Sequence, residues 1–231
     1  MNGTDGAGGT AAMSDSISPD GTVGGEPAGG AARTAAEHTA AMRELRASQR
    51  AKVAEVGDAG RGLVLVHTGD GKGKSSSAFG VVARALGWGQ RVAVVQFIKG
   101  TWKTGEKQFF ARFPDELVWH TMGEGFTWET QDRERDVAAA TAAFDKAVEL
   151  MGDGEFDLVV LDEIHIALRY DYLDPAAVVA GIRARATRTG VVSTGRDAPQ
   201  ALIDNADCVT EMREIKHPFK AGIRAQKGID F

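Results

Sequence analysis

A glycine- and lysine-rich loop contains the residues whose types and spacing point most directly to chemistry. The stretch 63–68, whose first four residues are apolar, leads into Gly69-Asp70-Gly71-Lys72-Gly73-Lys74-Ser75, and a helical pattern follows. Glycines let backbone N–H groups turn toward an anion, and a helix N-terminus adds partial positive charge. The Lys74 ammonium can contact phosphate oxygens, and the Ser75 hydroxyl can ligate Mg²⁺. We therefore expect the loop, up to Ser76, to bind the triphosphate of ATP.

The spacing of this loop differs from the common phosphate-loop pattern by one residue. That pattern places a glycine five residues before Gly73, where this chain has Thr68, and the leading glycine, Gly69, comes one residue later. The loop is thus one residue tighter and carries an additional lysine, Lys72. A ligand-free turn is the alternative, but the order of strand, loop and helix favours phosphate binding. The G-x-G-x-x-G spacing of dinucleotide folds is absent.

Acidic and basic residues follow two further apolar runs. The run 157–161 ends in Asp162-Glu163, and Arg196 comes shortly after the run 190–193. Open α/β sheets bind ligands at the carboxyl ends of their strands. Glu163 can hold Mg²⁺ together with Ser75, or orient a water, and the acidic pair can alternatively cap the next helix. Arg196 can reach the nucleotide from the same edge, or form a salt bridge within its loop.

The pattern of apolar residues predicts the elements that position these groups. Short β-branched runs alternate with helical stretches, and strands that are apolar throughout are typical of a parallel sheet covered on both faces. We expect a three-layer α/β domain of the P-loop (RecA-like) kind with a mostly parallel sheet. The expected strands are 63–67, 91–97, 117–121, 157–161, 190–193 and 207–211, and the expected helices are 75–86, 132–151, 175–186 and 199–204.

Composition divides the chain into three parts. Residues 1–33 contain no Leu, Phe, Trp or Tyr, which predicts a disordered N-terminal extension. Residues 34–58 predict a helix whose apolar stripe is sparse, so that it orders only against a ligand or a second subunit. Residues 59–231 contain the first aromatic residue, Phe79, and every strongly apolar run. We expect this last part to be a single domain that contains the phosphate loop.

Charge and cysteine content exclude several classes of function. The net charge is −5, so the chain lacks the excess of basic residues that binding to a nucleic-acid backbone requires. No apolar stretch approaches the roughly 20 residues of a membrane span. The single cysteine, Cys208, fits a reducing compartment. His165 does not match the helix of a zinc protease and is expected to be a structural group. We expect a cytoplasmic protein that binds neither nucleic acid nor membrane.

A glycine-rich loop over 123–130 contains two large aromatic residues, Phe126 and Trp128. No regular period places both on one face, so they are poor candidates for a buried stripe. They can pack as a lid over the domain, or form a wall for a flat, apolar ligand beside the phosphate site.

Four separated motifs together resemble the P-loop-type ATP:corrinoid adenosyltransferases, over about residues 60–231. These motifs are the short loop 68–75, the aromatic loop 123–130, the acidic strand end 161–163, and a closing stretch that runs from Thr210-Glu211-Met212 through Lys216-His217-Pro218-Phe219 to 225–231. Two positions depart from the family pattern. Asp70 and Ser75 stand where Asn and Thr are frequent, and Ser75 keeps the hydroxyl for the metal.

The resemblance implies a group transfer rather than a hydrolysis. In this family Co(I) of a reduced corrinoid attacks the 5′-carbon of ATP, and the whole triphosphate departs. Co(I) is so strong a nucleophile that no general base is required, and the protein contributes positioning and leaving-group stabilisation. Lys72, Lys74 and Mg²⁺ would neutralise the triphosphate, and ATP would bind in the reverse sense. Phe126 and Trp128 would occupy the lower face of the corrin and exclude its axial ligand.

The resemblance also implies partners. It implies a homodimer, a flavoprotein as the reductant, and a helix before the first strand that can close over the corrinoid. From the residues alone two other readings stay open. A small-molecule kinase or NTPase would share the loop and the acidic strand end, and a non-catalytic, nucleotide-gated binding module would need the loop only.

Overall fold

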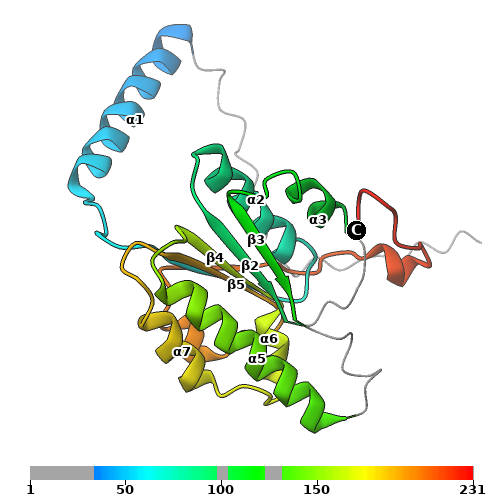
Figure 1. The fold of residues 1–231 in the computed structure, drawn as a ribbon. Coiled ribbons are helices and arrows are strands. Elements are labelled where there is room, and N and C mark those ends of the chain that lie inside the picture. The colour runs from blue at the N-terminus through cyan, green and yellow to red at the C-terminus, as the bar shows by residue number, and fades with distance from the viewer. Residues whose placement is uncertain (1–33, 98–103, 123–131, 231) are drawn as a thin grey trace, which may run out of the picture. The chain divides into compact units, whose positions relative to one another are not determined.

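A sheet of six parallel strands forms the centre of the protein. The computed structural model describes residues 34–97, 104–122 and 132–230. Every strand pairs in parallel with its neighbours, in the order β3-β2-β4-β5-β1-β6 (Figure 1). The strands are β1 (Val64–Thr68), β2 (Val92–Gln96), β3 (Leu117–Thr121), β4 (Leu158–Asp162), β5 (Gly190–Thr194) and β6 (Cys208–Glu211). The six predicted strands are confirmed, and the sheet is parallel throughout.

Helices cover both faces of the sheet, as the continuous apolar strands predict. Every residue of β2 and β4 is buried. Successive side chains of a strand point to opposite faces, so Val92 and Val94 belong to one core cluster while Ala93 and Val95 belong to the other. The cluster with Val92 and Val94 includes residues of α2 and α3, and the cluster with Ala93 and Val95 includes residues of α5, α6, α7 and α8. Figure 1 shows α2 and α3 on one face of the sheet and α5, α6 and α7 on the other. The predicted three-layer α/β fold is confirmed. One strand, β5, separates β1 from β4, which is the RecA-like arrangement.

The helices of the domain begin where the sequence offers caps and end at short turns. The Asp132 side chain caps α5, and Asp174 with Pro175 at the first position begins α7. Four predicted helices are confirmed as α2, α5, α7 and α8, although α7 ends three residues before the predicted position. The bounds are α2 (Lys74–Gly87), α3 (Gly105–Phe110), α5 (Arg133–Gly152), α6 (Ile164–Arg169), α7 (Pro175–Arg183), α8 (Gln200–Ile203) and a 3₁₀ turn (Pro218–Ala221). The short α3, α6 and 3₁₀ turn were not predicted, although the still shorter α8 was.

A separate helix, α1 (Ala35–Glu55), precedes the domain. Thr34 and Glu37 form a capping box at its start, and none of its own residues is buried. The chain divides into two compact units after Gly57, and α1 belongs to the first. Its expected role in covering a ligand stays a prediction, and residues 1–33 lie outside the described ranges. Within those ranges, no helix combines the length and the apolar character needed to cross a membrane.

Two helical glycines offer a matched test of packing. A Cβ at Gly181 in α7 would lie 2.8 Å from Phe144 Cζ and 3.0 Å from Val148 Cγ2 of α5, whereas a Cβ at Gly80 in α2 would meet no atom within 4 Å. We expect Gly80→Ala to raise the free energy of unfolding by about 0.5–1 kcal/mol through helix propensity. Gly181→Ala should lower it by about 1–2 kcal/mol, because α5 and α7 must separate. Urea unfolding of both variants measures the difference, and equal shifts would contradict the close packing.

Candidate functional site

The phosphate loop occupies the carboxyl end of β1 and leads directly into α2. Gly73 stands at the N-cap of α2 with φ of 111°, a left-handed conformation that favours glycine. The first backbone N–H groups of α2 have no partner within the helix, so they are available to an anion. The local structure thus matches the predicted order of strand, loop and helix.

The chain that follows β6 supports this loop from behind. The Gly71 N–H donates to the Met212 carbonyl at 2.7 Å, and the Met212 N–H donates to the Thr68 carbonyl at 2.8 Å. A Cβ at Gly71 would lie 2.7 Å from the Arg213 carbonyl, and one at Gly69 would overlap the Met212 oxygen. Glycine is therefore required here by a close backbone approach. Two of the sequence motifs, the loop and the start of the closing stretch, are in direct contact.

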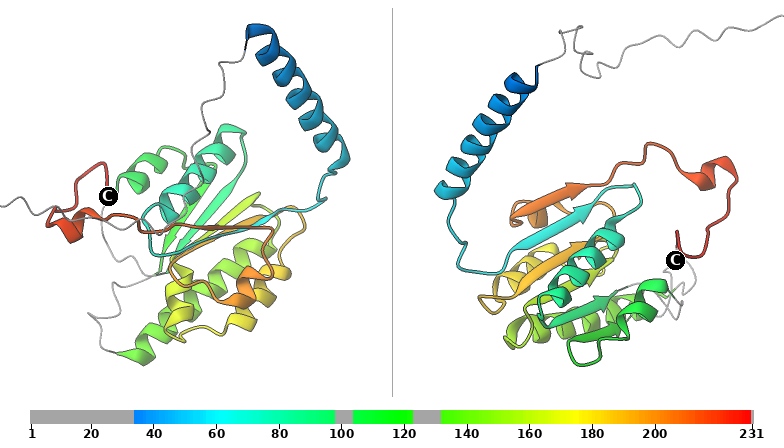
Figure 2. Two further views of the ribbon diagram at one scale, coloured as in Figure 1. Left: turned by 180° about the vertical axis from the view of Figure 1, so that it is seen from behind. Right: turned by 90° about the horizontal axis from the view of Figure 1, so that it is seen from above.

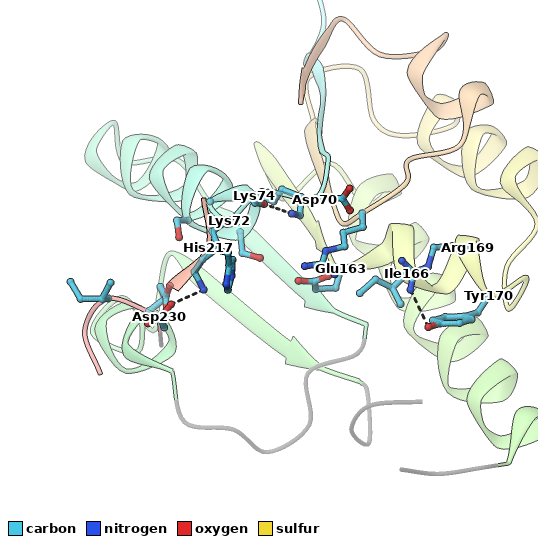
Figure 3. A pocket seen from close by; sticks show the side chains of 16 residues that line it. Asp70, Lys72, Lys74, Glu163, Ile166, Arg169, Tyr170, His217 and Asp230 are labelled. Carbon is cyan, nitrogen blue, oxygen red and sulfur yellow. Dashed lines mark hydrogen bonds and ion pairs between the residues drawn. The ribbon is translucent and has the colours of Figure 1, made fainter. Parts of the chain in front are cut away.

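One cavity of about 620 Å³ opens over the loop (Figure 3). Its lining includes most of the residues expected to bind ATP or metal, namely Asp70, Gly71, Lys72, Gly73, Lys74, Ser75, Ser76, Glu163 and Arg196. Gly69 is expected there too, but it packs against Met212 and is not among the lining residues of the described chain. Phe126 and Trp128 lie outside the described residues. The ligand roles of all these residues stay predictions.

Lys74 lies buried at the base of the cavity. The residue as a whole is 8% exposed, and its Nζ donates to the Gly71 carbonyl at 2.6 Å (Figure 3). Burial lowers the pKa of Lys74, and Arg196 lowers it further, whereas Glu163 raises it. The loop backbone thus holds the ammonium in a partly desolvated position. An entering anion would meet a cation that water screens poorly.

Lys72 differs from Lys74 in exposure and in partner. Its side chain is 51% exposed, and Nζ lies 2.6 Å from Oδ1 of Asp230, near the C-terminus. This ion pair was not predicted from the sequence, because the two residues lie far apart along the chain.

The two acids at the end of β4 have different environments. Asp162 is fully buried and accepts hydrogen bonds from Gln96 Nε2 and Thr194 Oγ1, each at 2.9 Å. Glu163 lines the cavity, with a backbone φ of 67°. Its N–H donates to Thr194 Oγ1 at 2.9 Å, and although it stands at the N-cap of α6, its side chain makes no capping bond. The alternative that Glu163 caps this helix is therefore wrong.

These bonds form a row across four neighbouring strands. Trp119 of β3 donates from Nε1 to Gln96 of β2 at 2.9 Å, Gln96 donates to Asp162 of β4, and Thr194 of β5 donates to the same carboxylate. A buried carboxylate is stable only when such donors satisfy it. Asp162 thus anchors the carboxyl edge of the sheet and holds the backbone of Glu163 beside the cavity.

His165 is a structural group, as expected. It is fully buried, with Nδ1 at 3.0 Å from the Gly195 carbonyl and Nε2 at 3.0 Å from Ser193 Oγ. Since a carbonyl only accepts, the bonds assign the proton to Nδ1, which donates to Gly195, while Ser193 donates to Nε2. Burial lowers the pKa of His165 to about 4, so the ring is neutral near pH 7.

Several lining residues were missed by sequence reasoning. They come from α3, α6 and the C-terminal segment, and they are Glu106, Ile166, Arg169, Tyr170, His217, Ile229 and Asp230. The α6 residues directly follow the acidic strand end, so their position along the chain was the available signal. The last three belong to the closing stretch, whose relation to the loop depends on tertiary contacts.

Comparisons with known proteins agree on one family. The family described as ATP:corrinoid adenosyltransferase BtuR/CobO/CobP matches residues 60–231. A corrinoid adenosyltransferase of Pseudomonas aeruginosa is 56% identical, over 84% of this chain and 95% of that protein. One from a Sinorhizobium species is 48% identical, over 93% and 100%. Corrinoid adenosyltransferase CobA of Salmonella typhimurium is 46% identical, over 74% and 86%.

The buried His165 predicts a specific dependence of stability on pH. The pKa is about 4 in the folded protein and 6.5 as the ordinary value, so between these pH values only the unfolded chain binds the proton. The contribution of the neutral His165 ring to the free energy of unfolding is therefore fully present above pH 6.5, and it is lost as the pH drops toward 4. This histidine should remove about 2 kcal/mol between pH 7 and pH 5.

Urea unfolding at both pH values, with wild type and His165→Gln, measures this loss. The variant should lose about 2 kcal/mol less than wild type between the two pH values. His67 and His120 also have lowered pKa values, but their contributions are common to both proteins and cancel. The pKa of Asp207 is about 2, so its titration falls below this window. An identical pH dependence in both proteins would show that His165 is not held neutral.

Proposed function

Because this chain belongs to the ATP:corrinoid adenosyltransferase BtuR/CobO/CobP family, we propose that it transfers the 5′-deoxyadenosyl group of ATP to Co(I) of a reduced corrinoid. The Co–C5′ bond forms with the electron pair of Co(I), the C5′–O bond breaks, and triphosphate leaves with that bond pair. One observation carries the proposal at the level of the site. The tight loop, with Lys74 buried beneath it, and Arg196 line a single cavity with Glu163.

The leaving group sets the main demand on the protein. A departing triphosphate gains negative charge, and catalysis follows from donors already aimed at the place where that charge develops. Here the backbone of the loop, Lys72, Lys74 and Arg196 supply those donors around the cavity. Lys74 is held by the Gly71 carbonyl before any ligand enters, so little reorganisation is needed. We assign triphosphate stabilisation to these groups.

Mg²⁺ fits the oxygen groups of the same cavity. Ser75 and Glu163 both line it, and hard cations prefer hydroxyl, carboxylate and phosphate oxygens. Among the described residues, no cluster of three or more His, Cys, Asp or Glu can hold a metal. Mg²⁺ commonly takes one or two protein ligands and completes its shell with phosphates and water. When bound, the ion would neutralise part of the triphosphate charge, with Ser75 and Glu163 as its protein ligands.

Phe126 and Trp128 would control the cobalt. They lie outside the described residues, so their assignment rests on the sequence motif. Against the lower face of the corrin they would exclude the axial ligand, which makes four-coordinate Co(II) easier to reduce. The same proposal includes a flavoprotein reductant, a homodimer, a cytoplasmic location, and α1 as an element that closes over the corrinoid.

The reaction itself tests the proposed function. Incubation with ATP, Mg²⁺ and chemically reduced cobalamin should yield a light-sensitive alkylcobalt product and intact triphosphate.

Lys74→Ala should lower kcat/KM for ATP by roughly 10²-fold, as loss of one preorganised donor does. Lys146→Ala is the control, since that lysine pairs with Glu149 on α5. Release of ADP without an alkylated corrinoid would instead indicate a kinase or NTPase. Nucleotide-dependent capture of a protein, without turnover of any substrate, would indicate a binding module.

The aromatic residues predict a difference between two starting states of cobalt. Phe126→Ala or Trp128→Ala should slow the reaction that starts from Co(II) and its reductant, while the reaction from pre-reduced Co(I) keeps its rate. The physical reason is that only Co(II) must lose an axial ligand before reduction. Parallel assays from both states measure the effect, and equal losses would rule out control of the axial ligand.

A further inference from the structure

The C-terminal segment 212–230 crosses the carboxyl edge of the sheet. It begins beside the phosphate loop, where Met212 accepts from Gly71. It ends near α3 (Figures 1 and 2). There Gly228 and Ile229 share a cavity of about 340 Å³ with Phe109 and Phe110. Three residues of the segment, His217, Ile229 and Asp230, line the main cavity.

A short turn holds the carboxylate of Asp230 in position. The Gln226 N–H donates to Asp230 Oδ2 at 2.8 Å, and the Asp230 N–H donates to the Gln226 carbonyl at 2.8 Å. The other carboxylate oxygen, Oδ1, lies 2.6 Å from Nζ of Lys72, and the Asp230 side chain is 10% exposed (Figure 3). The Lys72 ammonium and the Gln226 N–H lower the pKa of Asp230. The carboxylate is thus charged and oriented toward the loop lysine.

This contact balances the charge of the main cavity. Its lining includes four lysine or arginine residues, Lys72, Lys74, Arg169 and Arg196, and four acids, Asp70, Glu106, Glu163 and Asp230. With the lining histidine counted as neutral, the formal charges of these eight residues sum to zero while Asp230 faces Lys72. A triphosphate oxygen and a carboxylate oxygen accept the same bond from an ammonium, so both compete for Lys72. An entering triphosphate also repels the carboxylate.

We propose that Asp230 is an exchangeable counter-ion of Lys72: a triphosphate displaces it on binding, and it returns to Lys72 as triphosphate leaves. The inference rests on the proposed function, which makes triphosphate the product. A competing carboxylate weakens the binding of ATP and of triphosphate alike, so it speeds release of the product and raises the Kd for ATP. Asp230 contacts Lys72 and not the reacting carbon, so its role lies in binding and release.

Direct binding of sodium tripolyphosphate with Mg²⁺ tests the competition. By calorimetry on the full chain, Asp230→Asn should lower the Kd roughly 3- to 10-fold, since a charged competitor becomes neutral while its side-chain oxygen can still accept from Gln226. Glu155→Gln is the matched control. It removes the same charge from a pair with Arg91 at the opposite edge of the sheet, and its Kd should equal that of wild type. An unchanged or higher Kd for Asp230→Asn would overturn the proposal.

A double-mutant cycle identifies the partner. In a Lys72→Ala background, Asp230→Asn should change the Kd for tripolyphosphate less than about 2-fold, because the contested cation is gone. An equal gain with and without Lys72 would mean that Asp230 acts through general charge, and would overturn the exchange.

Proteolysis reports whether the segment moves. Tripolyphosphate should speed tryptic cleavage after Arg224 and Lys227 in wild type, because displacement of Asp230 frees their segment, whereas protection would contradict displacement.

None of these measurements needs a corrinoid. If adenosylation is absent while Asp230→Asn tightens tripolyphosphate binding, only the proposed function fails. If adenosylation occurs and Asp230→Asn has no effect on binding, only the present inference fails.

Discussion

Parallel pairing of all six strands is the constraint on which the rest of the molecule depends. Because every strand runs in one direction, the loops after β1, β4 and β5 and the segment after β6 emerge at a single edge. The polar residues that follow these strands meet there, although the chain between them forms helices on either face. Because helices cover both faces of the sheet, charged groups gather at the ends of its strands, and open α/β sheets bind ligands at this carboxyl end.

Buried polar bonds give this edge its rigidity. The row from Trp119 through Gln96 and Asp162 to Thr194 links four neighbouring strands, whose order in the sheet, β3-β2-β4-β5, differs from their order in the chain. His165 joins the same region through Ser193 and Gly195. These groups are satisfied by one another and are withdrawn from the cavity. The two neighbouring acids therefore have different roles: Asp162 anchors the backbone, and Glu163 lines the cavity.

The electrostatics of the cavity suit the departure of a highly charged leaving group. Lys74 is fixed by backbone, whereas Lys72 is more exposed and faces a carboxylate from the end of the chain. Under the proposed exchange, both lysines would bind the triphosphate, and the return of Asp230 to Lys72 would favour its release. Activation of a nucleophile by a protein base is not required of such a site when the nucleophile is Co(I). The family relationship and the chemistry of the cavity are consistent with each other.

The sequence by itself determined the strands, the longer helices, the phosphate loop and the family, because apolar periodicity, caps and glycine–lysine spacing are local properties. It did not reveal α3 or α6, two helices of six residues each. Only the tertiary structure decided that Met212 backs the loop, that Asp162 is an anchor and that Asp230 faces Lys72. These contacts join residues that are distant along the chain. Their approach depends on the order of strands in the sheet, which no local pattern specifies.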